Sequence, residues 1–379
     1  MNEKKKVLII TNTDLGKSGV PYVIYSIVKA LCEYVNFHVI TMADGSNYYF
    51  ERLATEGVSN VTLSKCKAYK PKTFLAKVFW LMIGAHWQNY KIAKLALKNK
   101  NYYAVHGFLE FQSFGLLKAA KKVGIEKRIL HVNTEHGLYK SSRAIKDKFL
   151  NWIEQRDKRL SIKYATDCLG VSKPCCEHAF GNSKCVVLHN DYDEQLFNQC
   201  KSCSLADDHL VLAHIATFSV NKNQLFVLRI INELKEYGYN VKALLIGTVI
   251  EKNYYCKILD YITINHLEDN VEIVDGSGDI SDYLRGASYG ILPSRSEGAG
   301  LVVTEFQACG MPVFASTAVP MDMNCGGVTY LNLEDGPKRW AQVILDYFRC
   351  YGNARHHYDV SGFSHKTFRR NLMQVYCLK

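Results

Sequence analysis

Two glutamates in the C-terminal half of the chain, Glu297 and Glu305, flank a glycine-bearing turn. The apolar run at residues 289–292 before the turn is typical of a buried strand, and apolar residues at helical spacing predict a helix at residues 301–309. The free N–H groups at the start of such a helix favour an anion. The stretch therefore predicts an anion site between two carboxylates. The alternative is an ordinary strand–turn–helix unit with Glu305 on a solvated helix face.

Other candidate residues follow the carboxyl ends of other predicted strands, where ligands meet a doubly wound sheet. Lys222 and Asn223 follow a strand at residues 209–215. Gly16 and Gly19 lie between a strand at residues 7–10 and a helix at about 21–34. This strand–loop–helix order is a phosphate-binding geometry, but the spacing of the two glycines alone fits any such turn.

Three histidines lie at or near strand ends in the first half of the chain: His106, His131 and His136. A single histidine is more often structural than catalytic, so only its place at a strand end favours a role in a site. His136 is part of the sequence Glu-His-Gly, which follows the strand predicted at residues 127–133.

The run EGAGLVVTEFQACGMP from Glu297 to Pro312, preceded by Pro293 and Ser294, resembles the nucleotide-sugar signature of family-4 retaining glycosyltransferases. The resemblance is strong from residue 270 to 350 and loose before residue 130. It implies an α/β fold of two Rossmann-like, doubly wound domains facing a central cleft, the GT-B fold. Residues 1–190 would then form an acceptor-binding domain and residues 191–360 a nucleotide-sugar-binding domain, and a helix in residues 361–379 would cross back to the first domain.

The resemblance also implies roles for individual residues. The family has a catalytic-site histidine after the strand at residues 127–133, for which His136 is the first choice and His131 the second, whereas one alignment would place Asn133 there. Glu305 would bind the donor ribose, Glu297 the hydroxyls of the donor sugar, and Lys222 the diphosphate; Glu297, Lys222 and His136 are the candidate catalytic residues. The remaining donor-binding candidates are Gly19, Asn223, Gly276, Arg295, Gly298, Ala299, Gly300, Leu301 and Val302. The acceptor-binding candidates are Gly16, His106 and His131. No metal or other cofactor is implied, and the sequence has no Asp-x-Asp cluster.

One position departs from the family pattern, because Thr217 stands where the family has an arginine. Threonine cannot replace the bidentate phosphate contact of a guanidinium. Either Lys222, the helix N-terminus and Arg295 suffice, or donor binding is weakened. The departure motivates one alternative, a non-catalytic GT-B scaffold or regulator. A second alternative is a soluble nucleotide-sugar synthase of the sucrose or trehalose type.

Charge is unevenly distributed along the chain. Residues 1–190 hold 30 Lys and Arg against 14 Asp and Glu, whereas residues 191–379 hold 17 against 22, within a total of +11. Lysines alternate with aromatic and aliphatic residues at 65–100, and a basic amphipathic helix is predicted at 141–164. These features favour contact with an anionic membrane surface over nucleic acid, for which no motif is present. The alternative is a pair of solvated helices.

Composition and targeting signals complete the prediction. There is no signal peptide, no run long enough to span a bilayer, and an odd number of cysteines, 13, which favours reduced thiols over a disulfide framework. The pair Cys200 and Cys203 lacks a partner pair for zinc. We expect a cytoplasmic enzyme, peripheral on the inner face of the plasma membrane. It would transfer sugar from a nucleotide sugar, with UDP-sugar favoured, to a lipid-linked saccharide in capsule or exopolysaccharide synthesis.

Overall fold

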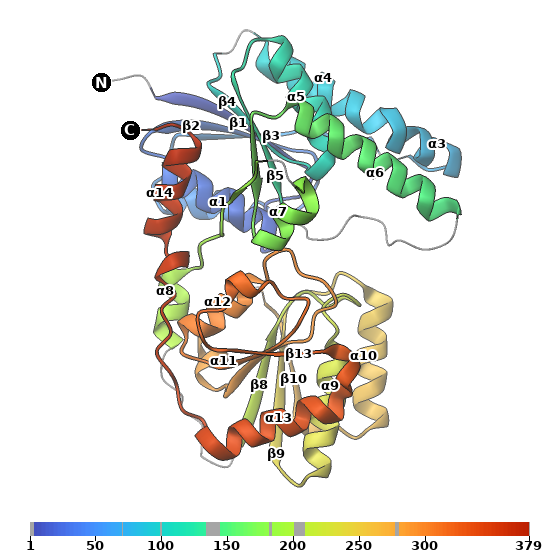
Figure 1. Ribbon diagram of the computed structural model, residues 1–379, viewed down its shortest axis with the longest axis vertical. Coiled ribbons are helices and arrows are strands. Elements are labelled where there is room, and N and C mark those ends of the chain that lie inside the picture. The colour runs from blue at the N-terminus through green and yellow to red at the C-terminus, as the bar shows by residue number, and fades with distance from the viewer. Residues whose placement is uncertain are drawn as a thin grey trace. The chain divides into compact units, whose positions relative to one another are not determined.

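The computed structural model describes residues 4–69, 71–98, 101–133, 145–181, 184–200, 209–276 and 280–378. The chain divides into two compact units. Unit 1 is Met1–Asp191 together with His365–Lys379, and unit 2 is Tyr192–Ser364. Each unit contains one parallel sheet with helices on both of its faces (Figure 1). The predicted α/β class, with two doubly wound sheets, is confirmed.

The sheet of unit 1 has seven strands in the order β3-β2-β1-β4-β5-β6-β7, and all neighbouring pairs are parallel. The chain adds strands in one direction from β1 to β3 and in the other from β4 to β7. The topological switch point therefore lies between β1 and β4, where a crevice at the carboxyl ends of the strands accepts ligands. The strands are β1 (Lys5–Thr11), β2 (Val35–Thr41), β3 (Val61–Lys65), β4 (Ala104–Phe108), β5 (Lys127–Val132), β6 (Asp167–Gly170) and β7 (Val186–Val187).

Both faces of this sheet are buried, which explains the continuous apolar run of β1. Val7 and Ile9 pack in the same cluster as residues of α1 (Gly19–Leu31) and α14 (His365–Val375). Leu8 and Ile10 pack on the opposite face with α4 (Ala85–Leu97) and α5 (Phe114–Lys122). Alternate residues of a strand point to opposite faces, so a strand covered on both sides reads as apolar throughout.

Other helices of unit 1 pack around the sheet and around the helices described above. α6 (Ile145–Tyr164) packs against α5, and a π-helical turn, η1 (Trp80–Gly84), joins α3 (Phe74–Phe79) to α4. In Figure 1, α14 at the C-terminal end lies beside α1, although the two are far apart in sequence. The other helices are α2 (Tyr48–Thr55) and α7 (Lys173–Phe180).

Unit 2 repeats the architecture with six parallel strands in the order β10-β9-β8-β11-β12-β13. Its switch point lies between β8 and β11. The strands are β8 (His209–Ile215), β9 (Asn240–Ile246), β10 (Val271–Val274), β11 (Tyr289–Leu292), β12 (Val313–Ser316) and β13 (Val328–Leu331). The helices are α8 (Glu194–Phe197), α9 (Gln224–Glu236), α10 (Lys252–Ile264), α11 (Ser281–Arg285), α12 (Leu301–Ala308) and α13 (Gly336–Tyr351).

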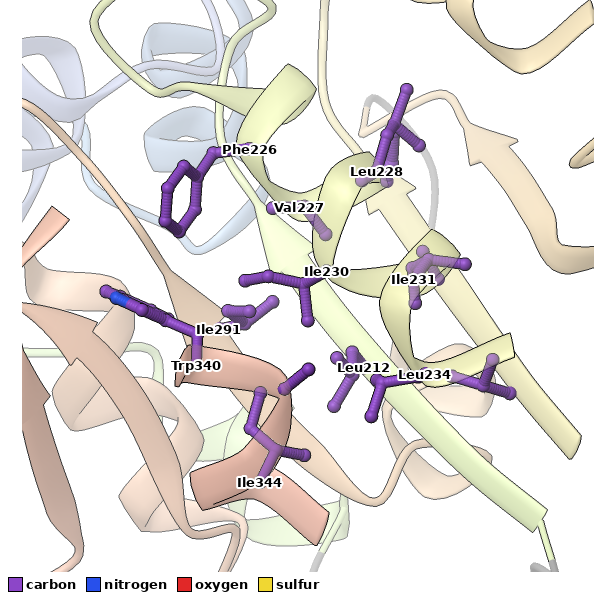
Figure 2. Packing of buried hydrophobic residues seen from close by; sticks show 14 of the residues in the cluster. Leu212, Phe226, Val227, Leu228, Ile230, Ile231, Leu234, Ile291, Trp340 and Ile344 are labelled. Atoms are coloured by element: carbon purple, nitrogen blue, oxygen red, sulfur yellow. The ribbon is translucent and has the colours of Figure 1, made fainter. Parts of the chain in front are cut away.

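Figure 2 shows the core between the sheet of unit 2 and helices α9 and α13. Trp340 is fully buried there, with its ring edge-on to Phe226 at a centroid distance of 5.3 Å. Its Nε1–H donates to Asn332 O at 2.9 Å, so the buried indole has its one donor satisfied. On the opposite face, a Cβ on Gly290 of β11 would come within 2.3 Å of the Phe306 ring, so glycine is needed for α12 to pack this closely.

Several predictions about local structure are corrected or fall outside the described residues. The helix predicted at 141–164 begins at Ile145, and residues 141–144 are not described. The expectation of reduced thiols is wrong for one pair, because Cys176 and Cys185 form a disulfide. These two residues are brought together by α7 and the start of β7, a proximity that their spacing did not reveal. No helix in the described ranges is long and apolar enough to cross a bilayer.

Candidate active site

The Lys222 ammonium and the Glu297 carboxylate form an ion pair at the switch point of unit 2. Lys222 lies in the loop after β8 and Glu297 in the loop after β11, the two strands that flank the switch point. Lys222 Nζ is 2.6 Å from Glu297 Oε1. Glu297 is only 6% exposed, and the same Oε1 accepts a hydrogen bond from Ser294 Oγ at 2.7 Å. A buried carboxylate is thus held by one cation and one hydroxyl, which offsets its loss of hydration.

Hydrogen bonds join the two loops that carry this pair. Asn221 Nδ2 donates to Ser296 O at 2.9 Å, and Arg295 N donates to Asn221 O at 2.8 Å. Asn223 has a left-handed backbone, with φ of 62°, and its Nδ2 donates to Pro293 O at 3.1 Å. Asparagine tolerates this conformation better than most residues do. The loops therefore form one cross-linked frame around the ion pair.

Gly300 immediately precedes α12 and has a φ of 71°, a conformation that glycine adopts without strain. The candidate residues Gly298, Ala299 and Gly300 thus form the approach to the helix, and Leu301 and Val302 form its first turn. The N–H groups of this turn have no partners within the helix. Glu297 lies against this turn, because its Cγ would be 3.7 Å from a Cβ on Gly300.

Glu305 lies in α12, near the turn that precedes α8. Burial of the carboxyl group, with a smaller contribution from repulsion by Asp193, raises the pKa of Glu305 to about 8. Asp193 Oδ1 accepts the N–H of Leu196 at 3.3 Å, at the start of α8. Glu305 is therefore protonated at neutral pH unless a bound group supplies hydrogen-bond donors to its charged form.

The remaining donor-site candidates lie around the same strand ends. Gly276 follows β10, and a Cβ there would come within 3.0 Å of Gly247 Cα after β9. Thr217 follows β8, and its carbonyl accepts Gln224 Nε2 at 3.0 Å. Arg295 is exposed in the loop after β11. The structure thus brings Lys222, Asn223, Glu297 and the α12 turn together, with Arg295 on the same loop as Glu297 and Gly276 on the loop after β10.

In unit 1, Gly16 and Gly19 lie in the loop between β1 and α1, on one side of the switch point. Gly16 N donates to Asp14 Oδ1 at 3.2 Å, and Gly19 begins α1. A Cβ on Gly19 would meet no atom within 4 Å, so the space in front of the helix is open at this residue.

His106 and His131 are fully buried and hydrogen-bonded to each other, with His106 Nε2 3.1 Å from His131 Nδ1. Tyr376 OH lies 2.6 Å from His106 Nδ1. Burial lowers the pKa of His131 to about 3; burial and the neighbouring ring hold the pKa of His106 well below its usual value. Both rings are therefore neutral at physiological pH. His136 lies outside the described residues.

Sequence reasoning missed several residues of this arrangement. Ser294 bonds Glu297, Asp193 repels the charge of Glu305, and Tyr376 bonds His106. The positions of these three residues in the sequence form no recognisable pattern that would have predicted the contacts. The order Pro-Ser-x-x-Glu did contain Ser294, without showing that it bonds Glu297. Within the described ranges, no group of three metal-ligating side chains is assembled.

Comparison with known proteins agrees with this architecture. Residues 209–349 match the family model described as glycosyl transferases group 1. EpsF of Bacillus subtilis, named as a glycosyltransferase, is 23% identical over 91% of this chain and 88% of its own length. The capsular polysaccharide biosynthesis glycosyltransferase CapH of Staphylococcus aureus is 24% identical over 67% of this chain and 71% of its own. The crystal structure of Anabaena HepE in complex with UDP-glucose superposes with a TM-score of 0.68 at 16% identity, covering 98% of this chain and 99% of that one.

These matches define a class of protein: a GT-B fold whose second unit carries the group 1 sequence pattern. Residues 209–349 carry the group 1 glycosyltransferase pattern, and the predicted resemblance of the chain to the family-4 glycosyltransferases is confirmed.

Proposed function

We propose that this glycosyltransferase moves a sugar from a UDP-sugar to a lipid-linked saccharide acceptor in bacterial surface polysaccharide synthesis, with retention of anomeric configuration. The Lys222–Glu297 pair beside the first turn of α12 is the observation that carries the proposal. The name of CapH and the UDP-glucose complex of HepE support the pathway and the nucleotide, respectively.

The residues of unit 2 have distinct tasks in this proposal. Lys222 and the first N–H groups of α12 stabilise the diphosphate as negative charge develops on the leaving group. Glu297, once Lys222 turns to the phosphate, accepts hydrogen bonds from hydroxyls of the donor sugar. Glu305 accepts hydrogen bonds from the ribose. No metal is required, because the ammonium and the helix terminus supply the positive potential.

The residues of unit 1 are proposed to serve the acceptor. Gly19 leaves room at the start of α1, and Gly16 lies in the loop before it. His131 lies on β5, next to β4, with its Nδ1 engaged by His106. Because His106 is held between Tyr376 and His131, we assign it to orienting His131 rather than to direct contact. His136 remains the proposed catalytic histidine.

The surface of α3, η1 and α4 supports contact with an anionic membrane. Phe79, Ile83, Trp87 and Leu95 are 61%, 52%, 57% and 76% exposed and form a row in the sequence, at intervals of four and eight residues along the helical segment. Because each four-residue step rotates about 40° around a helix, this row winds across the exposed surface. Lys91 completes the row, with its Nζ 3.4 Å from the centroid of the Trp87 ring. No Asp or Glu occurs from residue 57 to 109. An apolar row with lysines and no acids fits the interface of an anionic bilayer.

A second part of this surface lies on α6. Phe149 and Trp152 are 36% and 50% exposed, and their rings stack with centroids 6.2 Å apart. Arg156 lies 5.8 Å from the Trp152 ring. The helix therefore presents apolar rings next to a cation, as α4 does.

A donor panel tests the enzymatic proposal. Thermal stabilisation and release of free nucleotide are measured with UDP-glucose, UDP-galactose, UDP-N-acetylglucosamine, GDP-mannose and ADP-glucose, because a bound ligand raises the melting temperature by mass action. We expect saturable stabilisation by at least one UDP-sugar. If a UDP-sugar binds but is not turned over, whichever acceptor-containing extract is added, the result would instead favour the scaffold or regulator that Thr217 suggests. Stabilisation by none of the five contradicts the proposal.

A further inference from the structure

The turn that follows β4 holds a residue in a conformation that its side chain disfavours. Glu110 begins the 3-10 turn η2 (Glu110–Ser113) with a φ of 46°, in the left-handed region. Glutamate has no local hydrogen bond that favours this region, unlike asparagine, and has a Cβ, unlike glycine. Such a residue persists only where its surroundings fix it, and strained residues of this kind concentrate at functional sites.

Buried side chains from two helices fix this turn. Asn89 of α4 is 2% exposed and donates Nδ2 to Gln112 O at 3.0 Å. Ser161 of α6 is fully buried and donates Oγ to Phe111 O at 2.7 Å. Burying two polar side chains to satisfy two carbonyls of one short turn shows that its shape is strongly determined.

The strained backbone brings the Glu110 carboxylate to the end of the neighbouring strand. Asn133, the residue after β5, donates its backbone N–H to Glu110 Oε1 at 3.1 Å. Asn133 Oδ1 is shielded from solvent and accepts no hydrogen bond from any described residue. The backbone of Asn133 is thus held in place, and its buried side-chain oxygen has no donor among the described residues.

The location is one where ligands bind in this kind of sheet. Glu110 follows β4, one of the two strands that flank the switch point of unit 1, and Gly16 and Gly19 follow the other, β1. A glycine at this position would relieve the strain but would lose the hydrogen bond that the Glu110 carboxylate accepts at the end of β5.

We propose that Glu110 is a positioning residue for glycosyl transfer: it holds the Asn133 backbone so that Asn133 Oδ1 accepts a hydrogen bond from a sugar hydroxyl. The inference rests on the proposed function. Glu110 acts through Asn133 and does not exchange a proton with the substrate.

Three variants separate positioning from other roles. Glu110→Gly removes the carboxylate and the strain together. Glu110→Gln keeps the side-chain length and an acceptor oxygen, so a positioning role tolerates it and a proton-transfer role does not. His266→Gly is the matched control, because His266 also has a left-handed φ, 51°, but lies in the exposed turn after α10 in unit 2.

Hydrogen exchange at the Asn133 amide tests the positioning without any turnover. We expect exchange at least tenfold faster than wild type in Glu110→Gly, within about threefold of wild type in Glu110→Gln, and unchanged in His266→Gly. Equal exchange in wild type and Glu110→Gly overturns the inference, whether or not the protein transfers sugar.

Turnover of the UDP-sugar that the wild type uses tests the consequence. We expect Glu110→Gly, folded by circular dichroism and melting no lower than wild type, to lose at least tenfold in kcat with donor KM within threefold. Glu110→Gln and His266→Gly should keep kcat within threefold. Full kcat in Glu110→Gly overturns the inference, as does equal loss in the Gly and Gln variants, which would show that the carboxylate reacts directly. A wild type that turns over no donor would contradict the proposed function, and the exchange result would still decide the positioning.

Discussion

Lys222 Nζ and Glu297 Oε1 lie 2.6 Å apart although 75 residues separate them in the chain. The cation proposed for the diphosphate is thus paired with the carboxylate proposed for the sugar. Donor binding would replace this one contact by two, and the two residues should therefore respond differently to substitution.

We expect Lys222→Met to weaken UDP binding about 10- to 100-fold, since a charge-assisted hydrogen bond contributes roughly 1.5–3 kcal/mol. Glu297→Gln should leave UDP binding unchanged or tighter, because it frees the ammonium, while transfer falls. Isothermal titration with UDP, together with turnover of the preferred UDP-sugar, measures both. Equal UDP affinity in wild type and Lys222→Met would remove Lys222 from the diphosphate site.

Thr217→Arg places a guanidinium where the family has one. The new side chain follows β8 near Lys222, so UDP affinity should rise about tenfold, and the gain should shrink at high salt. Titration at low and high ionic strength tests this, with Thr217→Gln as the uncharged control of similar length. A loss of affinity in the arginine variant would show that this loop directs residue 217 away from the phosphates.

The raised pKa of Glu305, about 8, makes donor binding depend on pH. The folded protein keeps a proton that the unfolded chain loses near pH 4.5, so the stability contributed by this residue is full below that pH and declines as pH rises toward 8. Ribose hydroxyls donate best to the charged carboxylate, so UDP affinity should rise up to about pH 8 and then level off. Asp193→Asn, which removes a repelling charge, should move this rise to lower pH. Glu305→Gln should abolish it in titrations from pH 6 to 9.

Tyr376→Phe removes the hydroxyl next to buried His106 and should lower the free energy of unfolding by about 1–2 kcal/mol in urea denaturation. His106 and His131 have folded-state pKa values below the usual 6.5, so their burial destabilises the protein as pH falls below 6.5. Tyr330→Phe in unit 2 is the control for loss of a tyrosine hydroxyl that does not contact a histidine. It removes the hydrogen bond from the partly buried Tyr330 hydroxyl to Pro320 O. A Tyr376→Phe protein as stable as wild type would show that the hydroxyl bond contributes nothing.

The exposed row on α3 and α4 predicts binding to anionic vesicles. Trp87→Ser and Lys91→Glu should each weaken co-sedimentation with phosphatidylglycerol vesicles about fivefold or more, because each lysine near such a surface contributes about 1 kcal/mol. Leu259→Ser and Lys257→Glu, which alter exposed positions on α10 of unit 2, should change it little. If the α4 variants and the α10 variants lose co-sedimentation equally, the binding depends on overall charge and not on this surface. If the wild-type protein does not co-sediment with the vesicles at low salt, a membrane role is contradicted.

Much of the fold could be predicted because both sheets are buried on both faces. Runs such as Val7–Ile10 and Leu210–Ala213 are apolar throughout, and the strand–loop–helix order around Glu297 is explicit in its glycines and helical spacing. The pairing of Lys222 with Glu297 could not be predicted, since it depends on β8 and β11 being neighbours. The burial of His106 and its bond to Tyr376 were also invisible, because they arise from the return of α14 to the sheet of unit 1. The left-handed Glu110 left no mark in the sequence, since glutamate carries no preference for that conformation.

The bond between His106 and Tyr376 spans 270 residues of chain, and all of unit 2 is synthesised between them. At ribosomal rates of about 5–20 residues per second, the histidine waits roughly 10 to 60 s for its partner. During that interval the face of the first sheet that α14 covers, with Ile9 and Ile129 among its apolar residues, is open to water and to other nascent chains. The yield of folded protein on expression should therefore be limited by the exposure of this apolar surface during synthesis. A fusion partner or chaperone that acts during synthesis should raise the yield more than one that acts after release from the ribosome.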